Sequence, residues 1–467
     1  IPIIAAALAL QSCGGVGGPQ TETGGLPSVT QQFLALLGVD QRSATYIGAD
    51  ACAGCHGGKN PDDPIYAHWK DTVHAEKGVT CERCHGPGSA HQAAPSKENI
   101  LTFPKATSPI VCAQCHGPTH DQFNFSAHVK LIASPVDGAV TNPAQTRSSA
   151  CMSCHSGLFR TMVNEKGKVL ADLQDDEIRW IAENTLTGSP HSASCVTCHN
   201  PHSKTGNLTD DGKEVMLRKK NFNTDITDVA PGTTAQQFTN FDHGCAQCHN
   251  GRGTNPADAR LQTGTARPSM HDSNQYNMLM GFGGVEGSGP VQRNTAHANA
   301  PGQCTKCHMP DSRHSFTVSF DKGCAPCHSA ADAAARTGQV KSEVLGLLTS
   351  LRGRMEAWAA ANLGDADFWD YTSVIQGEGK TPPNQANVPI EIKRARHNYY
   401  FIIRSGDYGV HNAPYAKHLV TVANTNLDAL NAPRPAAPNM SAEQQLRVIE
   451  EHRKRANRAE MNLPEDN

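Results

Sequence analysis

The last third of the chain repeats apolar residues with the period of an α-helix. Over residues 330–363 these apolar positions are Val344, Leu345, Leu347, Leu348, Leu351, Met355 and Trp358. Their spacing predicts one long helix. Residues 377–389, which include Pro382 and Pro383, interrupt the pattern, and residues 390–430 resume helix-like apolar spacing.

A second kind of helix is predicted close to the C-terminus. Residues 441–462 are polar and rich in charge, and Ser441 precedes Glu443 and Gln444 as an N-cap would. We therefore expect residues 331–467 to form a helical domain whose Trp, Tyr and Leu side chains pack on one another. Its helices are also candidates for a homo-oligomer contact.

The remainder of the chain lacks such a pattern. Of 467 residues only 38% are apolar and 5% aromatic, with 41 glycines and 29 prolines. This composition is lean for an ordinary side-chain core, so something else must fill the interior. The net charge of −3 gives no reason to expect nucleic acid as a partner.

The cysteines indicate what fills the interior of this part of the chain. Sixteen of the 17 cysteines form Cys-x-x-Cys pairs, and a histidine follows every pair directly. The pairs are Cys52 and Cys55, Cys81 and Cys84, Cys112 and Cys115, Cys151 and Cys154, Cys195 and Cys198, Cys245 and Cys248, Cys304 and Cys307, and Cys324 and Cys327. The histidines are His56, His85, His116, His155, His199, His249, His308 and His328.

Cys-x-x-Cys-His is the attachment motif of c-type haem. Each thiol forms a thioether to one vinyl group, and the adjacent histidine ligates the iron. Zinc ribbons and redox-active dithiols also use paired cysteines, but neither requires a histidine after every pair. The sequence therefore predicts eight covalently attached c-type haems, each with its motif histidine as the proximal iron ligand.

The spacing of the motifs predicts the fold class. Their first cysteines are separated by 29, 31, 39, 44, 50, 59 and 20 residues, too few for separate side-chain cores. We expect a mainly α fold with much irregular loop, wrapped over residues 45–330 round eight closely packed haems.

The sixth ligand of each iron is expected to be a second histidine. Fifteen of the 23 histidines lie outside the motifs, and several stand close to one. The distal candidates are His74, His91, His128, His191, His202, His297, His314 and His411. A histidine beside one haem reaches a neighbouring iron more easily than its own. Surface or hydrogen-bonding roles suit His68, His120, His243, His418 and His452 at least as well as ligation. Methionine is the alternative ligand, and Met309 is the one to consider, with packing as its other role.

The N-terminus predicts export. Residues 1–12 resemble the apolar part of a signal peptide, and residues 10–13, Leu-Gln-Ser-Cys, resemble a lipobox. Cys13 is then a lipidation site and residues 13–44 form a flexible linker. The alternative is an ordinary signal peptide with an incidental cysteine. Gly14 rather than aspartate follows Cys13, which favours the outer membrane.

Residues 150–430 resemble a known family. "QCTKCHMP", then "RHSFTVSFDKGCAPCH", then long helices, is similar to the pentahaem ammonia-forming cytochrome c nitrite reductases and their octahaem relatives, which include hydroxylamine oxidoreductase. The resemblance places the family's catalytic haem at Cys151, Cys154 and His155. The nitrite reductases have lysine at the position of His155, whereas hydroxylamine oxidoreductase has histidine.

The chain also departs from that family. The stretch "CHNGRGTNP", after Cys245, lacks the tyrosine and the acidic calcium ligands that the resemblance implies there. His271 falls where the family has a catalytic histidine. It could donate a proton to a substrate, close the open face by ligating the iron, or simply lie in a loop.

The sequence thus predicts an exported octahaem cytochrome that transfers electrons through bis-histidine haems to redox protein partners. Its expected place is the periplasm or the cell surface, bound to the outer membrane by lipid, with extracellular electron transfer as its setting. The alternative is an oxidoreductase acting on nitrite or hydroxylamine at the fourth haem, with His271 as a catalytic residue. A further alternative is a subunit of a conductive filament.

Overall fold

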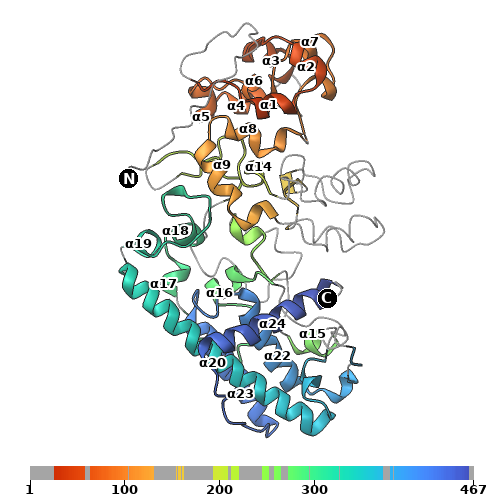
Figure 1. The fold of residues 1–467 in the computed structure, drawn as a ribbon, viewed down its shortest axis with the longest axis vertical. Coiled ribbons are helices and arrows are strands. Elements are labelled where there is room, and N and C mark those ends of the chain that lie inside the picture. Colours follow the sequence, from red (N-terminus) through yellow and green to blue (C-terminus); the bar gives the residue numbers. More distant parts are fainter. Residues whose placement is uncertain are drawn as a thin grey trace, which may run out of the picture. The chain divides into compact units, whose positions relative to one another are not determined.

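The computed structural model is mainly α-helical between long irregular segments (Figure 1). It describes residues 26–57, 64–103, 105–130, 154, 156–158, 160–161, 193–208, 212–219, 244–251, 257–263, 272–293, 295–325, 327–371, 379–381 and 383–461. These residues contain only isolated β-bridges and no longer strand. The predicted fold class, mainly α with much irregular loop, is confirmed.

The chain divides into two compact units. The first contains residues 1–106 and 110–115, and the second contains residues 107–109 and 116–467. The division falls within the third motif, so Cys112 and Cys115 belong to the first unit and His116 to the second.

Short helices make up the first unit. They are α1 (Gln31–Leu36), α2 (Val39–Ser43), α3 (Ala49–His56), α4 (Ile65–Trp69), α5 (Val73–Glu76), α6 (Cys81–His85) and α7 (Ser89–Ala93), and α8 (Pro109–Ala113) lies where the units divide. Phe33, Leu37, Leu101 and Val111 form a small apolar cluster in this unit. Such short helices are unstable alone and depend on what they pack against.

The second unit begins with equally short elements. They are α9 (Gly117–Asn124), α14 (Cys195–Cys198), α15 (Asp258–Thr263), α16 (Gln275–Met280), α17 (Thr295–Ala298), α18 (Cys304–His308) and α19 (Phe320–Gly323). Several motifs coincide with a single helical turn. A helical turn brings two cysteines three residues apart and the following histidine to one side of the backbone.

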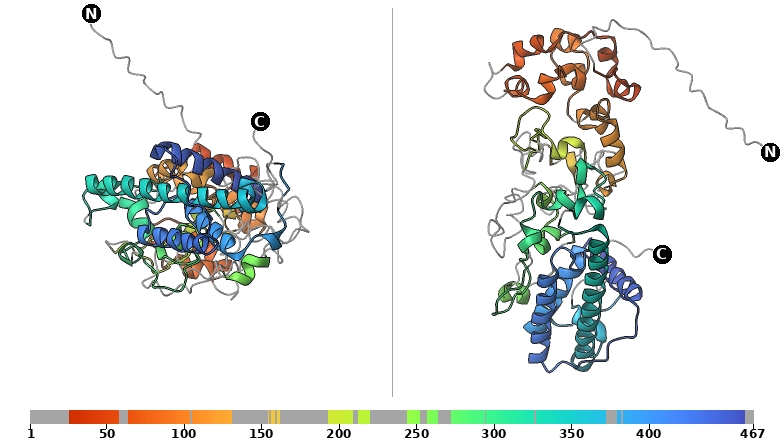
Figure 2. Two further views of the ribbon diagram at one scale, coloured as in Figure 1. Left: turned by 90° about the horizontal axis from the view of Figure 1, so that it is seen from below. Right: turned by 90° about the vertical axis from the view of Figure 1, so that its left-hand side faces the viewer.

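Four longer helices complete the second unit and pack into a bundle (Figures 1 and 2). They are α20 (Ala330–Leu363), α22 (Ile390–Ser405), α23 (Ala413–Ala429) and α24 (Ala442–Met461). The bounds of α20 match the prediction, and its predicted apolar positions are buried except Leu347, which is 37% exposed. Ser441 and Gln444 exchange the two hydrogen bonds of a capping box, 3.2 and 2.8 Å long, at the start of α24.

The bundle has an ordinary side-chain core. Leu348 and Leu351 of α20, Tyr399 of α22 and Leu419 of α23 are fully buried in one continuous apolar cluster. Residues 390–430, predicted to resume the helical pattern, form two helices because Gly406, at φ 67°, ends α22.

A buried ionic network lies inside this core. Arg396 of α22 donates from Nε to Asp370 at 2.6 Å, and the hydroxyl of Tyr400 donates to the same carboxylate at 2.6 Å. His452 of α24 lies 3.4 Å from Asp370 and 3.1 Å from the Tyr400 hydroxyl. Burial opposes ionisation of Asp370, but Arg396 and His452 outweigh it and hold the pKa of that carboxyl well below its usual value.

No helix among the described residues combines the length and apolar character that crossing a membrane requires. The predicted signal peptide, Cys13 and the first part of the linker lie outside the described residues, whereas residues 26–44 of the linker carry α1 and α2.

Candidate haem sites

Five histidines that end a motif each face a second histidine ring. The pairs are His56 with His91 (6.4 Å between ring centroids), His199 with His314 (6.2 Å), His249 with His128 (6.1 Å), His308 with His411 (6.3 Å) and His328 with His297 (6.4 Å). The second ring is in every case one of the eight distal candidates. The two histidines of a pair lie between 31 (His297 and His328) and 121 (His128 and His249) residues apart in the sequence.

This spacing fits one metal ion between two imidazoles. A metal–imidazole bond is about 2 Å long and a ring centre lies about 1 Å from its nitrogen, so two rings on opposite sides of one iron have centroids about 6 Å apart. Two imidazoles packed directly on each other would lie closer. The residues of these five pairs therefore fit an iron held by two histidines.

The ring nitrogens also have the orientation that ligation requires. Six rings direct Nδ1 at an uncharged oxygen: His85 at Leu101 O (2.6 Å), His91 at Ser96 O (2.9 Å), His199 at Val215 O (2.8 Å), His249 at Gln275 Oε1 (3.1 Å), His308 at Phe316 O (3.1 Å) and His314 at Ser312 O (2.8 Å). A ring that donates from Nδ1–H keeps its Nε2 lone pair for a metal. Such contacts are typical of histidines that ligate metals.

Two rings face carboxylates instead. His411 Nδ1 lies 3.0 Å from Asp407 Oδ2, and His328 Nδ1 lies 3.4 Å from Asp332 Oδ2. Asp407 is buried, and its carboxylate also accepts hydrogen bonds from the Ser405 hydroxyl and the His411 amide. Burial would raise the pKa of Asp407, but the charge of His411 and these hydrogen bonds hold it at about 2.

Burial favours the neutral form of several of these rings. Burial lowers the pKa of His128 to about 4, with a further contribution from His249, and it lowers the pKa of His199 and His308. A neutral imidazole is the form that binds a metal. The pKa of His411 is raised, because the charge of Asp407 outweighs both burial and the opposing charge of Lys341.

Within the first unit, the first three motifs are neighbours. Cys52 and Cys81 share a side-chain hydrogen bond that lowers the pKa of Cys52 to about 7. Burial raises the pKa of Cys84 to about 11, and the nearby thiol of Cys115 adds to the shift. The second motif thus lies between the first and the cysteines of the third.

Within the second unit, the fifth, sixth and fourth motifs are neighbours. Burial raises the pKa of Cys198 to about 12, with Cys245 and Cys248 adding to the shift. A side-chain hydrogen bond with Cys154 lowers the pKa of Cys248 to about 6. The pKa of His199, lowered mainly by burial, also responds to the charge of His116. The sixth motif is therefore central to this group.

The seventh and eighth motifs continue the series. The pKa of His308 is lowered by burial and then by His411 and His249, so the seventh motif adjoins the sixth. The ring of His297 hydrogen bonds to the backbone of His411, which joins the eighth pair to the seventh. Within this unit His116 adjoins the fifth motif, and the fifth motif adjoins the sixth. The sixth motif also adjoins the fourth and the seventh, and the seventh adjoins the eighth.

A buried cation, Arg160, lies beside the sixth motif. Arg160 donates to Gln247 Oε1 and to Gln247 O, both at 3.1 Å, and lies 3.7 Å from Cys248 Sγ. It is 7% exposed, and among the described residues no carboxylate pairs with it. Arginine binds carboxylates in a bidentate manner, so Arg160 can hold a haem propionate.

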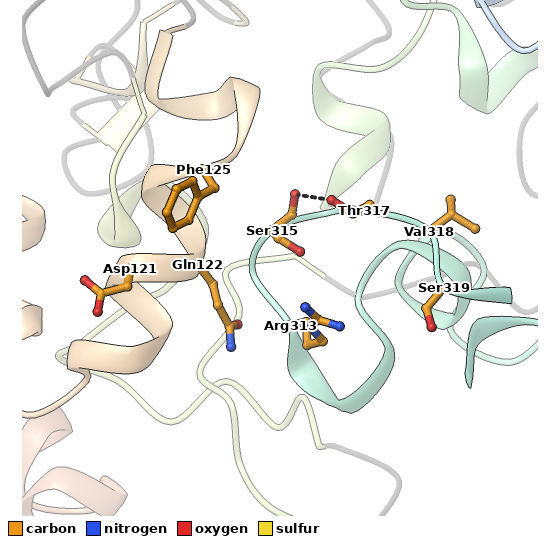
Figure 3. A pocket seen from close by; sticks show the side chains of 8 residues that line it. All are labelled: Asp121, Gln122, Phe125, Arg313, Ser315, Thr317, Val318 and Ser319. Atoms are coloured by element: carbon orange, nitrogen blue, oxygen red, sulfur yellow. Dashed lines mark hydrogen bonds between the residues drawn. The ribbon is translucent and has the colours of Figure 1, made fainter. Parts of the chain in front are cut away.

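A cavity of about 420 Å³ lies beside the segment that carries His314 (Figure 3). One wall is formed by Asp121 and Gln122 of α9 and by Phe125 at its end. The other wall is formed by Arg313, Val318 and the hydroxyl-bearing residues Ser315, Thr317 and Ser319. Gln122 Oε1 accepts a hydrogen bond of 3.0 Å from the His314 amide, which links the two walls. The guanidinium and hydroxyl groups could bind the propionate edge of a porphyrin.

The other histidines of the prediction have varied places. His74 lies in α5 and His202 follows the fifth motif. His418 accepts or donates a hydrogen bond at Glu286 O (2.9 Å), and His452 belongs to the ionic network of the bundle. Cys151, His155, His191, His243 and His271 lie outside the described residues. The proximal and distal assignments stay predictions.

Residues 36–86 match a family model described as cytochrome c554 and c-prime. The matched stretch contains the first two motifs. The match supports covalent c-type haem in this chain. It covers a small part of the sequence and includes the contact between Cys52 and Cys81.

The chain is similar in fold to two solved cytochromes. One is an undecahaem cytochrome from the S-layer of Carboxydothermus ferrireducens, with 19% identity over 76% of this chain and 51% of that one, at a TM-score of 0.44. The other is the outer cell wall cytochrome OcwA, with 18% identity over 75% and 70% of the chains, at a TM-score of 0.46. The chain spans about half the length of the undecahaem protein. No curated protein matches the chain in sequence.

Two residues of these sites were not found by sequence reasoning. Arg160 is one of many arginines, and no pattern separates it from a surface residue. Asp407 stands four residues before His411 in "GDYGVH", a spacing that could have drawn attention to the pair.

Proposed function

We propose that the protein carries electrons along a series of c-type haems whose irons are each held by two histidines. The observation that carries this proposal is the set of five ring pairs at 6.1–6.4 Å, each joining a motif histidine to a distal candidate. Haem iron supplies one-electron oxidation and reduction when it is bound. The chain's own residues attach the cofactor, fix the orientation of the imidazoles and exclude water from them.

The ring pairs support one assignment of the ligands that the sequence left open. In this proposal His91 serves the first motif, His314 the fifth, His128 the sixth, His411 the seventh and His297 the eighth. With both axial positions filled, an iron has no place for a substrate, and its environment changes little between oxidation states. Both properties suit transfer to a neighbouring site.

The remaining predictions belong to the same proposal. Eight haems, a haem-bearing domain over residues 45–330 and a helical domain over residues 331–467 fit the two kinds of packing described above. Lipidation at Cys13 would hold the protein on the membrane, at the cell surface or in the periplasm, where redox proteins are its partners. The helical domain is the candidate contact for a homo-oligomer.

The enzymatic alternative concerns the fourth motif. A reaction with nitrite or hydroxylamine at the haem of Cys151, Cys154 and His155 needs one open iron and a group that attracts an anion. The buried guanidinium of Arg160, in the same region as Cys154, is the observation that favours it. A conductive filament is a further possibility that the same carrier would allow.

Electron paramagnetic resonance of the oxidised holoprotein tests the proposal. We expect low-spin signals from the paired irons, with haem counted separately by pyridine haemochrome. His128→Ala should convert one haem of the total to high spin, because it removes the partner of His249. His120→Ala is the matched control, since the ring of His120 contacts the side chains of Asn124 and Asp121.

The outcomes separate the alternatives. An unchanged spectrum for His128→Ala at full haem content contradicts the assignment of His128. A high-spin haem in the unaltered protein supports an open fourth site, and nitrite and hydroxylamine are then the substrates to try.

A further inference from the structure

In the seventh site a buried charge faces one of the two histidine rings. His411 Nδ1 lies 3.0 Å from a carboxylate oxygen of Asp407, whose side chain is only 7% exposed. His308, on the other side of the same pair, faces the uncharged carbonyl of Phe316 at 3.1 Å. The seventh pair thus combines one ordinary imidazole with one that has a buried anion behind it.

The fold holds this anion firmly. Asp407 lies in the loop between α22 and α23, which turns through residues with positive φ at Gly406, Tyr408 and Gly409. Its carboxylate accepts hydrogen bonds from the Ser405 hydroxyl, the Gly409 amide (3.3 Å) and the His411 amide (2.8 Å). A methyl group at Gly409 would meet Val344 of α20 at 3.0 Å, so the loop is packed against the bundle.

A negative charge behind an imidazole acts on the metal in front of it. Its electrostatic field makes the ring a stronger donor and favours the more positive oxidation state of the iron. The effect is large where water does not screen the charge, and Asp407 is buried.

The eighth site provides an internal comparison. His328 also faces a carboxylate, that of Asp332, at 3.4 Å. Both side chains are more than one third exposed, and Asp332 also pairs with Arg336 at 2.8 Å. Solvent and a competing cation therefore weaken that charge.

We propose that Asp407 sets the reduction potential of the seventh haem, through His411, below the potential of its neighbours. This inference rests on the proposed function, because it requires His411 to be an axial ligand. The seventh site adjoins the sixth through His249 and the eighth through His297. An electron that passes along this part of the series then crosses an energetic step at the seventh site, and at partial reduction the seventh haem is the one that stays oxidised.

Asp407→Asn in the full-length holoprotein tests the role of the charge. Asparagine keeps the size and one acceptor oxygen but removes the charge. In a potentiometric titration followed by visible absorbance, we expect one haem transition to shift to a higher potential while the others stay in place. Asp407→Glu keeps the charge and should restore the low potential, and Asp332→Asn should shift one transition by a smaller amount.

His411→Ala separates this inference from the assignment beneath it. If His411→Ala converts one haem to high spin and Asp407→Asn leaves the titration unchanged at full haem content, the role of Asp407 is wrong and the ligand pair stands. If His411→Ala leaves every haem low-spin, the seventh pair itself is wrong, and the inference fails with it.

Discussion

The two parts of this chain bury apolar surface in different ways. In the bundle, α20 extends over 34 residues and the core is built from side chains such as Leu348, Met355 and Tyr399. In the motif-bearing part, the longest described helices, α3 and α9, have eight residues, and the first unit's apolar cluster has four buried members. Helices of that length do not persist alone in water. The comparison teaches that the sequence relies on side chains in one region and on a cofactor in the other.

Withholding the cofactor should separate the two regions most strongly. We expect the full chain, produced without haem attachment, to lose amide protection over residues 26–328 and to keep it in α20, α22, α23 and α24. The reason is that the bundle buries its own side chains, whereas each motif lacks the group it surrounds. Hydrogen–deuterium exchange with mass spectrometry measures both regions in one sample.

Equal protection in both regions would show that the motif-bearing part folds without haem. Equal loss in both would show that the bundle depends on the rest of the chain. Either result would contradict the expectation that the motif-bearing part depends on haem and the bundle on its own side chains.

Asp370→Asn should have the next largest effect, and the loss of stability should be confined to the bundle. Removing one partner of a buried ion pair leaves Arg396, which is 2% exposed, without its counter-charge and lowers the free energy of unfolding by about 3–5 kcal/mol. Amide exchange in α22 reports the loss, and the haem spectrum should not change.

Glu343→Gln is the matched control in the same bundle. It removes an exposed pair between Glu343 of α20 and Lys417 of α23, whose attraction solvent screens, so the free energy of unfolding should barely change. If both substitutions lowered the free energy of unfolding by a similar amount, the buried network would stabilise the bundle no more than the exposed pair does.

Acidification should produce the smallest effect, with a definite sign. Burial lowers the pKa of His452 below its ordinary value of 6.5, so the unfolded chain binds a proton more readily than the folded one. The contribution of His452 is complete above pH 6.5 and declines as the pH falls toward its folded pKa. Asp370, whose pKa is also lowered, adds a loss below pH 3.8.

Amide exchange in α24, corrected for the intrinsic pH dependence, measures this decline between pH 7.5 and 4.5. His452→Gln should flatten it over that range. A free energy of unfolding that rises on acidification would contradict the expected sign.

The sequence was sufficient to predict features that depend on neighbouring residues. The bounds of α20 and the cap at Ser441 follow from apolar spacing and from side chains three residues apart. The residues at which α22 ends and α23 begins were not predicted, although His411 was placed at a polar turn, because apolar residues continue on both sides of it. The sequence feature that marks this turn is the pair of glycines, Gly406 and Gly409, which adopt positive φ.

The pairing of ligands could not be predicted in this way. His314 stands six residues after the seventh motif in sequence but faces His199 of the fifth, and His128 faces His249 of the sixth. Which ring meets which depends on how loops pack round the haems, and no local pattern records that. The effect of the Asp407 charge could not be predicted either, since it depends on the burial of the side chain and not on its residue type.

The distances along the chain between paired histidines bear on the order in which the proposed haem sites would form. His56 and His91, like His297 and His328, close short loops, whereas His199 and His314, His249 and His128, and His308 and His411 are more than 100 residues apart in sequence. Closing a longer loop carries a larger loss of chain entropy, and a long-range contact forms more slowly than a local one. The local sites are therefore expected to become six-coordinate first. During maturation the fifth, sixth and seventh irons pass through a period with one position exposed to whatever ligands the compartment contains.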